Sequence, residues 1–210
     1  MFGGSVGASG VLVARKITPP GPGFAWHWRN RTRWSYIWGI ITVWLAKLLT
    51  KVTGIPTITS ELKVRLFKAD GRIIDYGVVS RRVVTNNGVG YIVDAWQNLV
   101  ELENMKYHGC GTGTTAEAAG DSALVTESTT ALNPDSTRGT GTQTEPASNQ
   151  VTSTGTNTFD ASAAITEHGL FSQAATGGGV LWDRSVFSAI NVVSGDSIQF
   201  AYTATFTAGG

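Results

Sequence analysis

The chain has a single cysteine, few charged residues, and no acidic residue among its first 60 positions. Cys110 cannot form an intrachain disulfide by itself, so the fold does not depend on one. Charged side chains make up 15% of the 210 residues, well below the roughly 25% of a typical soluble domain. Such a low charge fits an assembly whose surfaces meet other subunits better than it fits a solitary cytosolic enzyme.

The absence of acids at the start divides the chain into two chemically different parts. All fifteen Asp and Glu residues lie in 61–210, whereas residues 1–60 hold seven Lys or Arg and five of the seven Trp. The opening part is therefore basic and aromatic, and the remainder is mildly acidic and rich in Thr and Gly. An asymmetry of this kind usually indicates that one part attaches to something.

An uncharged apolar run long enough to cross a membrane is also missing. Residues 34–46 carry no charge, but a spanning helix needs about 20 apolar residues, and this length is reached only by including Lys47. Residues 1–14 have no basic segment before an apolar run, so we expect no secretory signal. Basic flanks and Trp residues at the edges keep membrane insertion of this segment open as an alternative.

Residues 1–33 are predicted to form an extended anchoring arm. The sequence PPGPG at 19–23 excludes a regular helix and favours extended or turn conformations. Phe24, Trp26 and Trp28 then alternate with other residues, which places their rings on one side of an extended chain. Because the arm has no core of its own, we expect it to become ordered only against a partner.

Residues 34–53 are predicted to form one long apolar helix. Apolar side chains recur there at spacings of three and four and nearly encircle the helix. Gly54 and Pro56 are expected to end it. A helix that is apolar nearly all round needs burial on more than one side, so this segment requires a protein or lipid partner.

Residues 61–210 are predicted to be an all-β body, an antiparallel β-sandwich of jelly-roll or immunoglobulin-like type. Asp70-Gly71 between alternating runs at 62–67 and 72–79 is the strongest short-range signal of a hairpin. Residues 196–206 alternate apolar and polar side chains, so one face of that strand is expected in the core. Several short strands separated by turns are typical of a sandwich.

Two other parts of the body are less regular. Residues 89–99 are expected to form a short helix that places Ile92, Trp96 and Leu99 on one face. Residues 111–158 are predicted to be mostly Thr/Gly-rich loops with short strands. If these loops were exposed, they could form a recognition surface for a receptor or a glycan.

The spacing of candidate ligands does not support a nucleotide or metal site. The glycine run at 109–113 lacks the Lys-Ser/Thr ending of a phosphate-binding loop. His108, Cys110 and His168 match no standard zinc spacing. We therefore expect no cofactor and no metal.

Catalytic residues are not indicated either. His168, Asp183 and Ser185 provide the residue types of a hydrolase triad, but no Gly-x-Ser-x-Gly nucleophile elbow is present. We expect no enzymatic activity. Asp183 and Arg184 are neighbours in a strand and should point to opposite faces, so they cannot pair with each other. Glu167 and Asp196 are expected to cap turns, and five aromatic residues are expected in the core: Phe171, Trp182, Phe187, Phe200 and Tyr202.

Three stretches of the body resemble virion structural proteins of tailed bacteriophages. They are YHGCGTGTTAE at 107–117, ITEHGLF at 165–171 and LWDRSVFSAINVVSGDSIQF at 181–200. The similarity spans about 62–206 and does not include the arm. It implies a non-enzymatic sandwich that is displayed on, or built into, a particle as a head decoration (cement), tail or fibre component.

Aromatic and Arg side chains, which the arm combines, are typical of anchors at protein–protein interfaces. We predict a virion protein whose partners are major capsid, portal or tail proteins and copies of itself. The seven Lys and Arg residues of the N-terminal part (1–60) are too sparse to favour nucleic acid, and a membrane is the remaining alternative. The predicted anchoring residues are Trp26, Trp28, Arg29, Arg31, Arg33, Trp34, Trp38 and Trp44.

Overall fold

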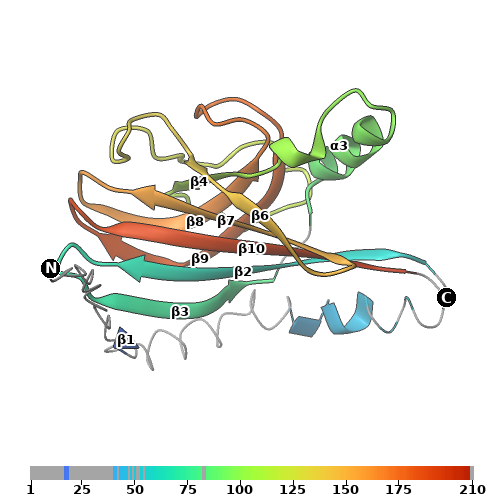
Figure 1. Ribbon diagram of the computed structural model, residues 1–210, viewed down its shortest axis with the longest axis horizontal. Coiled ribbons are helices and arrows are strands. Elements are labelled where there is room, and N and C mark those ends of the chain that lie inside the picture. Colours follow the sequence, from blue (N-terminus) through green and yellow to red (C-terminus); the bar gives the residue numbers. More distant parts are fainter. Residues whose placement is uncertain are drawn as a thin grey trace, which may run out of the picture.

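Two β-sheets form the body of the protein (Figure 1), and the buried apolar side chains of the described residues form one large hydrophobic core and a smaller cluster around Phe171. The computed structural model describes residues 17–18, 40–41, 43–46, 48, 50, 53, 55–81 and 84–208. The six-stranded sheet has the order β1 (Ile17–Thr18), β3 (Ile73–Ser80), β2 (Thr57–Phe67), β10 (Ser197–Thr207), β7 (Gln150–Thr158) and β6 (Thr142–Ala147). The four-stranded sheet has the order β5 (Gly139–Thr140), β4 (Tyr107–Gly111), β8 (Ala163–Phe171) and β9 (Leu181–Val192).

Nearly all of this pairing is antiparallel. Among the described strands, only β1 and β3 run parallel to each other. The first and last strands of the body, β2 and β10, are neighbours over eleven residue pairs, from Thr57 opposite Thr207 to Phe67 opposite Ser197. The described body is therefore mostly antiparallel β in two sheets, as the sequence predicts for a β-sandwich.

The hairpin predicted around Asp70-Gly71 joins β2 and β3. Gly71 has φ +84°, and its N–H donates to the carbonyl of Lys68 over 2.9 Å. A left-handed residue at this point closes a tight turn with little strain only if it is glycine. This prediction is confirmed.

The alternation of apolar and polar side chains predicted for β10 determines which of its faces lies in the core. Ile198, Phe200, Tyr202 and Ala204 are buried, whereas Phe206 at the end of the strand is partly exposed. On the facing sheet, Trp182 donates its indole N–H to the hydroxyl of Tyr202 over 2.9 Å. The five aromatic residues predicted for the core are all buried.

The predicted short helix is α3 (Asn86–Trp96), and it begins three residues earlier than the sequence suggested. Asn86, Asn87 and Gly88 form its first turn because Thr85 caps it: the Thr85 hydroxyl accepts the Gly88 N–H over 3.0 Å. A Cβ at Gly88 would lie 2.6 Å from the carbonyl oxygen of Trp182, so glycine allows the helix to pack directly on β9. A short 3₁₀ turn, η1 (Leu102–Asn104), follows.

The region predicted as Thr/Gly-rich loops contains more sheet than expected. β7 is nine residues long and lies between β10 and β6 inside the six-stranded sheet. Residues 112–138 are irregular, apart from isolated bridges such as Gly111 to Glu127 and Leu132 to Phe159. The first half of 111–158 is thus irregular, and the second half contains strands, of which β7 is longer than the short strands expected there.

A long apolar helix over 34–53 is not found among the described residues of that range. Residues 40, 41, 43–46, 48, 50 and 53 are helical, and the other positions of the range lie outside the described residues. Helical segments in proteins are stabilised mainly by packing of an apolar face, yet most of the described apolar side chains here are exposed. Val43 and Ala46 are half-buried, and the polar residue Thr50 is buried, with its hydroxyl 3.0 Å from that of Thr57 in β2.

The predicted arm over 1–33 lies outside the described residues except for β1. In the part of the chain that the structure describes, no helix has the length and apolar character needed to cross a membrane.

Candidate partner-binding segment and the polar face beside it

Of the eight predicted anchoring residues, the structure describes one, Trp44. The other seven, Trp26, Trp28, Arg29, Arg31, Arg33, Trp34 and Trp38, lie outside the described residues. Trp44 is 63% exposed, and the neighbouring apolar side chains Ile40, Ile41, Leu45 and Leu48 are 38–47% exposed. We call these five residues the anchor cluster. The structure does not bring the cluster into the core of the body.

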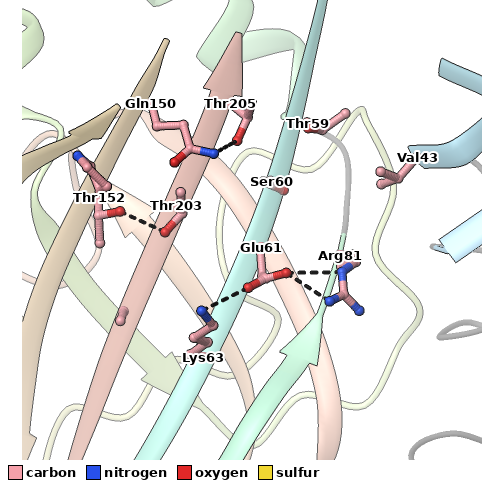
Figure 2. A pocket seen from close by; sticks show the side chains of 12 residues that line it. Val43, Thr59, Ser60, Glu61, Lys63, Arg81, Gln150, Thr152, Thr203 and Thr205 are labelled. Atoms are coloured by element: carbon pink, nitrogen blue, oxygen red, sulfur yellow. Dashed lines mark hydrogen bonds and ion pairs between the residues drawn. The ribbon is translucent and has the colours of Figure 1, made fainter. Parts of the chain in front are cut away.

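A pocket of about 520 Å³ lies between this helical segment and the outer face of the six-stranded sheet. Figure 2 shows Val43 on one side and the side chains of β2, β7 and β10 on the other. The polar residues that line it are Thr59, Ser60, Glu61, Lys63, Arg81, Gln150, Thr152, Thr203 and Thr205. The surface next to the segment is therefore made mainly of hydroxyl, amide and charged groups.

Cross-strand rows explain why this face is polar. Glu61, Thr203 and Thr152 stand opposite one another on β2, β10 and β7, and the two Thr hydroxyls are 2.7 Å apart. One step along the strands, Gln150 donates to the Thr205 hydroxyl over 3.2 Å. Since side chains alternate between the faces of a strand, the same strands that fill the core present these polar rows outward.

Charge reinforces the polarity of the face. The Glu61 carboxylate lies 3.3 Å from Nζ of Lys63 and 2.8 Å from Nη2 of Arg81 (Figure 2). Such partly exposed pairs contribute only about 0–1 kcal/mol to stability. Removing them from water without new partners is unfavourable, so this face is a poor site for burying an apolar helix. The anchor cluster consequently stays exposed within one chain.

Two buried histidines of the body contact each other. His108 lies between His168 and Ser153, with its ring nitrogens 2.9 Å from His168 Nε2 and 2.9 Å from Ser153 Oγ. Burial lowers the pKa of His108 to about 3. The pKa of His168 is also lowered, by burial and then by the proximity of His108. Both imidazoles are therefore neutral at pH 7, and they pack against the ring of Phe200.

The possible zinc ligands do not come together as a metal site. Within the described ranges, no group of three His, Cys, Asp or Glu residues could hold a metal ion. Cys110 is buried opposite His168, and burial raises the pKa of its thiol to about 12. A thiol rather than a thiolate is therefore present at neutral pH, and thiols are poor ligands and nucleophiles.

The three residues of the possible hydrolase triad do not contact one another as a triad requires. Ser185 donates to Oδ1 of Asp183 over 3.0 Å, and His168 contacts His108. A triad needs the serine beside the imidazole and the acid behind it. Asp183 also accepts a 3.0 Å hydrogen bond from Ser60, and burial raises its pKa to about 7.

Asp183 and Arg184 point to opposite faces, as predicted. Arg184 contacts Glu167, at 2.8 Å from Nη2 to Oε2, and Asp121, at 3.0 Å. Glu167 caps backbone as predicted, by accepting N–H bonds from Gly113, Val125 and Thr126. The sequence did not reveal that Glu167 is fully buried and pairs with Arg184 while it binds the backbone of the irregular region.

A second buried cation was missed altogether. Arg138 pairs with Glu127, at 2.6 Å from Nε to Oε1, and donates to the carbonyls of Gln173 and Gly178. Its guanidinium carbon lies 3.4 Å from the centroid of the Phe171 ring. No local pattern identifies this residue, because its partners come from separate parts of the chain.

No protein-family model matches the chain, and no curated protein matches it.

Proposed function

We propose that this chain is a non-enzymatic structural component of a tailed-phage particle, which decorates or cements the capsid and attaches through its N-terminal segment. Two observations support this proposal. The body, over about 62–206, resembles virion structural proteins, and the anchor cluster is exposed beside a polar sheet face. In this proposal the displayed module is a sandwich of jelly-roll or immunoglobulin-like type, and the protein resides in the virion.

The anchor cluster carries the argument. Fully burying one large apolar side chain contributes about 1.5–3 kcal/mol. Trp44 is 63% exposed and its four apolar neighbours are each more than one-third exposed, so their burial against a partner provides several kcal/mol, on the order of 4–5 in total. In this proposal, an apolar crevice between subunits of a major capsid or portal protein buries the cluster.

Particle binding of a full-length double variant tests this proposal. Trp44→Ser with Leu48→Ser removes two large exposed side chains of the cluster without touching the core. We expect the wild type to sediment with particles that lack the protein and the double variant to remain in the supernatant. Val193→Ser, which changes an exposed apolar side chain of the body, is the matched control and should bind as the wild type does. Equal binding of the double variant would contradict the proposal.

A second candidate function is a tail or fibre component that binds a cell surface through its sandwich. The observation that favours it is the polar pocket in Figure 2, whose hydroxyl, amide and charged groups suit a glycan. Thr203→Val in the centre of the pocket should then abolish binding to host cells, while the Trp44 and Leu48 changes should leave it intact. Flotation with liposomes separates both candidates from a membrane-anchored module, which alone requires lipid.

A further inference from the structure

Helix α3 carries a second exposed apolar surface. The helix rests on the body through Gly88 and Tyr91, which are buried. Val89, Val93 and Trp96, at spacings of four and three, lie on another side of the helix. Val93 is 55% exposed and Trp96 90% exposed. We use the name α3 surface for Val89, Val93, Trp96 and the exposed residues Leu99 and Leu102 that follow.

This surface has no partner within the described body. Trp is normally one of the most buried residues on average, and contiguous exposed apolar surfaces usually mark interaction sites. The surface also borders a cavity of about 300 Å³, which Leu102 lines together with Met105, Val151, Trp182 and Phe206. An incoming apolar side chain could fill this cavity, as aromatic anchors do at the centre of protein interfaces.

The edge of the α3 surface is acidic. Asp94, Glu101 and Glu103 are exposed beside its apolar residues. Lys106 is the only Lys or Arg in the sequence between 86 and 106. A partner that covers this surface must therefore be apolar and carry positive charge.

The N-terminal part of the same chain has these two properties. Residues 1–60 contain seven Lys or Arg and no acid, and Lys47 and Lys51 flank the end of the anchor cluster in the sequence. The exposed members of the cluster are apolar. The two surfaces are thus complementary in both charge and hydropathy.

Within one chain they lie far apart. Figure 1 shows α3 above the two sheets and the helical residues of 40–53 below the six-stranded sheet. We propose that the α3 surface of one copy binds the N-terminal segment, including Trp44, of a second copy. This inference rests on the anchoring role proposed above and gives that anchor a specific partner.

The contact joins two different surfaces, so the assembly is head-to-tail. A pair of copies keeps one free α3 surface at one end and one free segment at the other, and repetition generates a ring or an open filament.

Sedimentation velocity of purified full-length variants tests the contact. Trp96→Glu alters only the α3 surface, and Trp44→Glu with Leu48→Glu alters only the segment. We expect each variant to weaken self-association at least tenfold. An equimolar mixture should restore pairs, because each variant still has the surface that the other lacks. Val193→Glu, an exposed apolar-to-acid change elsewhere on the body, should associate as the wild type does. Association of the wild type should also weaken as salt is raised.

Several results would overturn the inference. They are a wild type that stays monomeric at its highest soluble concentration, a Trp96→Glu variant that associates normally, or a mixture that forms no pairs. Because this assay contains no particles, its outcome is separate from the particle-binding test. Normal particle binding with no self-association would contradict the α3 contact and leave the proposed function standing. Normal self-association with no particle binding would contradict the proposed function and leave the α3 contact standing.

Discussion

Oε2 of Glu167 lies 2.8 Å from Nη2 of Arg184, and the two side chains are almost completely buried. Glu167 comes from β8 and Arg184 from β9. The same carboxylate accepts three backbone N–H groups from the irregular region that precedes β5. The Glu167 carboxylate therefore joins β9, through the ion pair, and the irregular region, through its backbone N–H groups, to β8 of the four-stranded sheet.

Removing the charge of Glu167 should destabilise the fold strongly. Glu167→Gln leaves the Arg184 guanidinium with one buried acidic partner fewer, which typically costs about 3–5 kcal/mol. Urea unfolding measures the loss directly. Glu61→Gln, at a partly exposed pair, is the control and should cost no more than about 1 kcal/mol. Similar losses in both variants would show that burial of the Glu167 pair is not what matters.

The raised pKa of Asp183 predicts a stability that depends on pH. Its pKa is about 7 in the folded chain against a usual value of 3.8, so the folded state holds this proton more tightly than the unfolded state. The contribution of Asp183 is greatest below pH 3.8 and is lost as the pH rises toward 7. In Asp183→Asn this dependence disappears. The stability of the wild type relative to the variant should therefore fall between about pH 4 and 7, by up to about 1.4 kcal/mol per pH unit. Denaturation of both proteins across this range tests it, and a constant difference would contradict it.

His108 should have the opposite effect. Burial lowers its pKa to about 3 from the usual 6.5, so below pH 6.5 the unfolded chain takes up a proton that the folded chain does not. This contribution is complete above pH 6.5 and declines as the pH falls toward 3. In His108→Gln, the free energy of unfolding should depend less steeply on pH between about 4 and 6, because about one proton fewer is taken up on unfolding. An unchanged slope would mean that His108 titrates normally in the folded chain.

Close packing around the same imidazole makes Gly155 sensitive to substitution. A Cβ at Gly155 would lie 2.5 Å from Cδ2 of His108, which is buried and cannot move away freely. Gly155→Ala should therefore cost about 1–3 kcal/mol, as overpacked cores do. A Cβ at Gly120 would have no neighbouring atom within 4 Å, and Gly120→Ala should be close to neutral by thermal unfolding. Equal melting temperatures for the two variants would refute the packing argument.

Local patterns in the sequence predicted the elements that depend on neighbouring residues. The Asp70-Gly71 turn, the alternation of β10 and the helical region before Leu99 were each visible because turn chemistry and periodicity act over a few residues. The helix start was misplaced because Thr85 caps the chain before two Asn and a Gly that by themselves suggest a turn.

Contacts between distant residues could not be predicted in this way. β7 is rich in Thr and Ser because one of its faces is the polar outer surface of the sheet, so its composition resembled that of a loop. Arg138 and Arg184 are buried by partners 11 to 69 residues away. The exposure of Trp96 likewise depends on which side of α3 meets β9, which Gly88 and Tyr91 determine.

The most direct test of the account is to image tailed-phage particles assembled in the presence of this protein, prepared with the wild type and with the Trp44→Ser, Leu48→Ser variant. The account predicts sandwich-shaped density on wild-type particles, with residues 34–53 at the contact with the particle, and loss of that density in the variant. Wild-type particles without such density, or variant particles that retain it, would contradict the central claim that this segment attaches the protein to a particle.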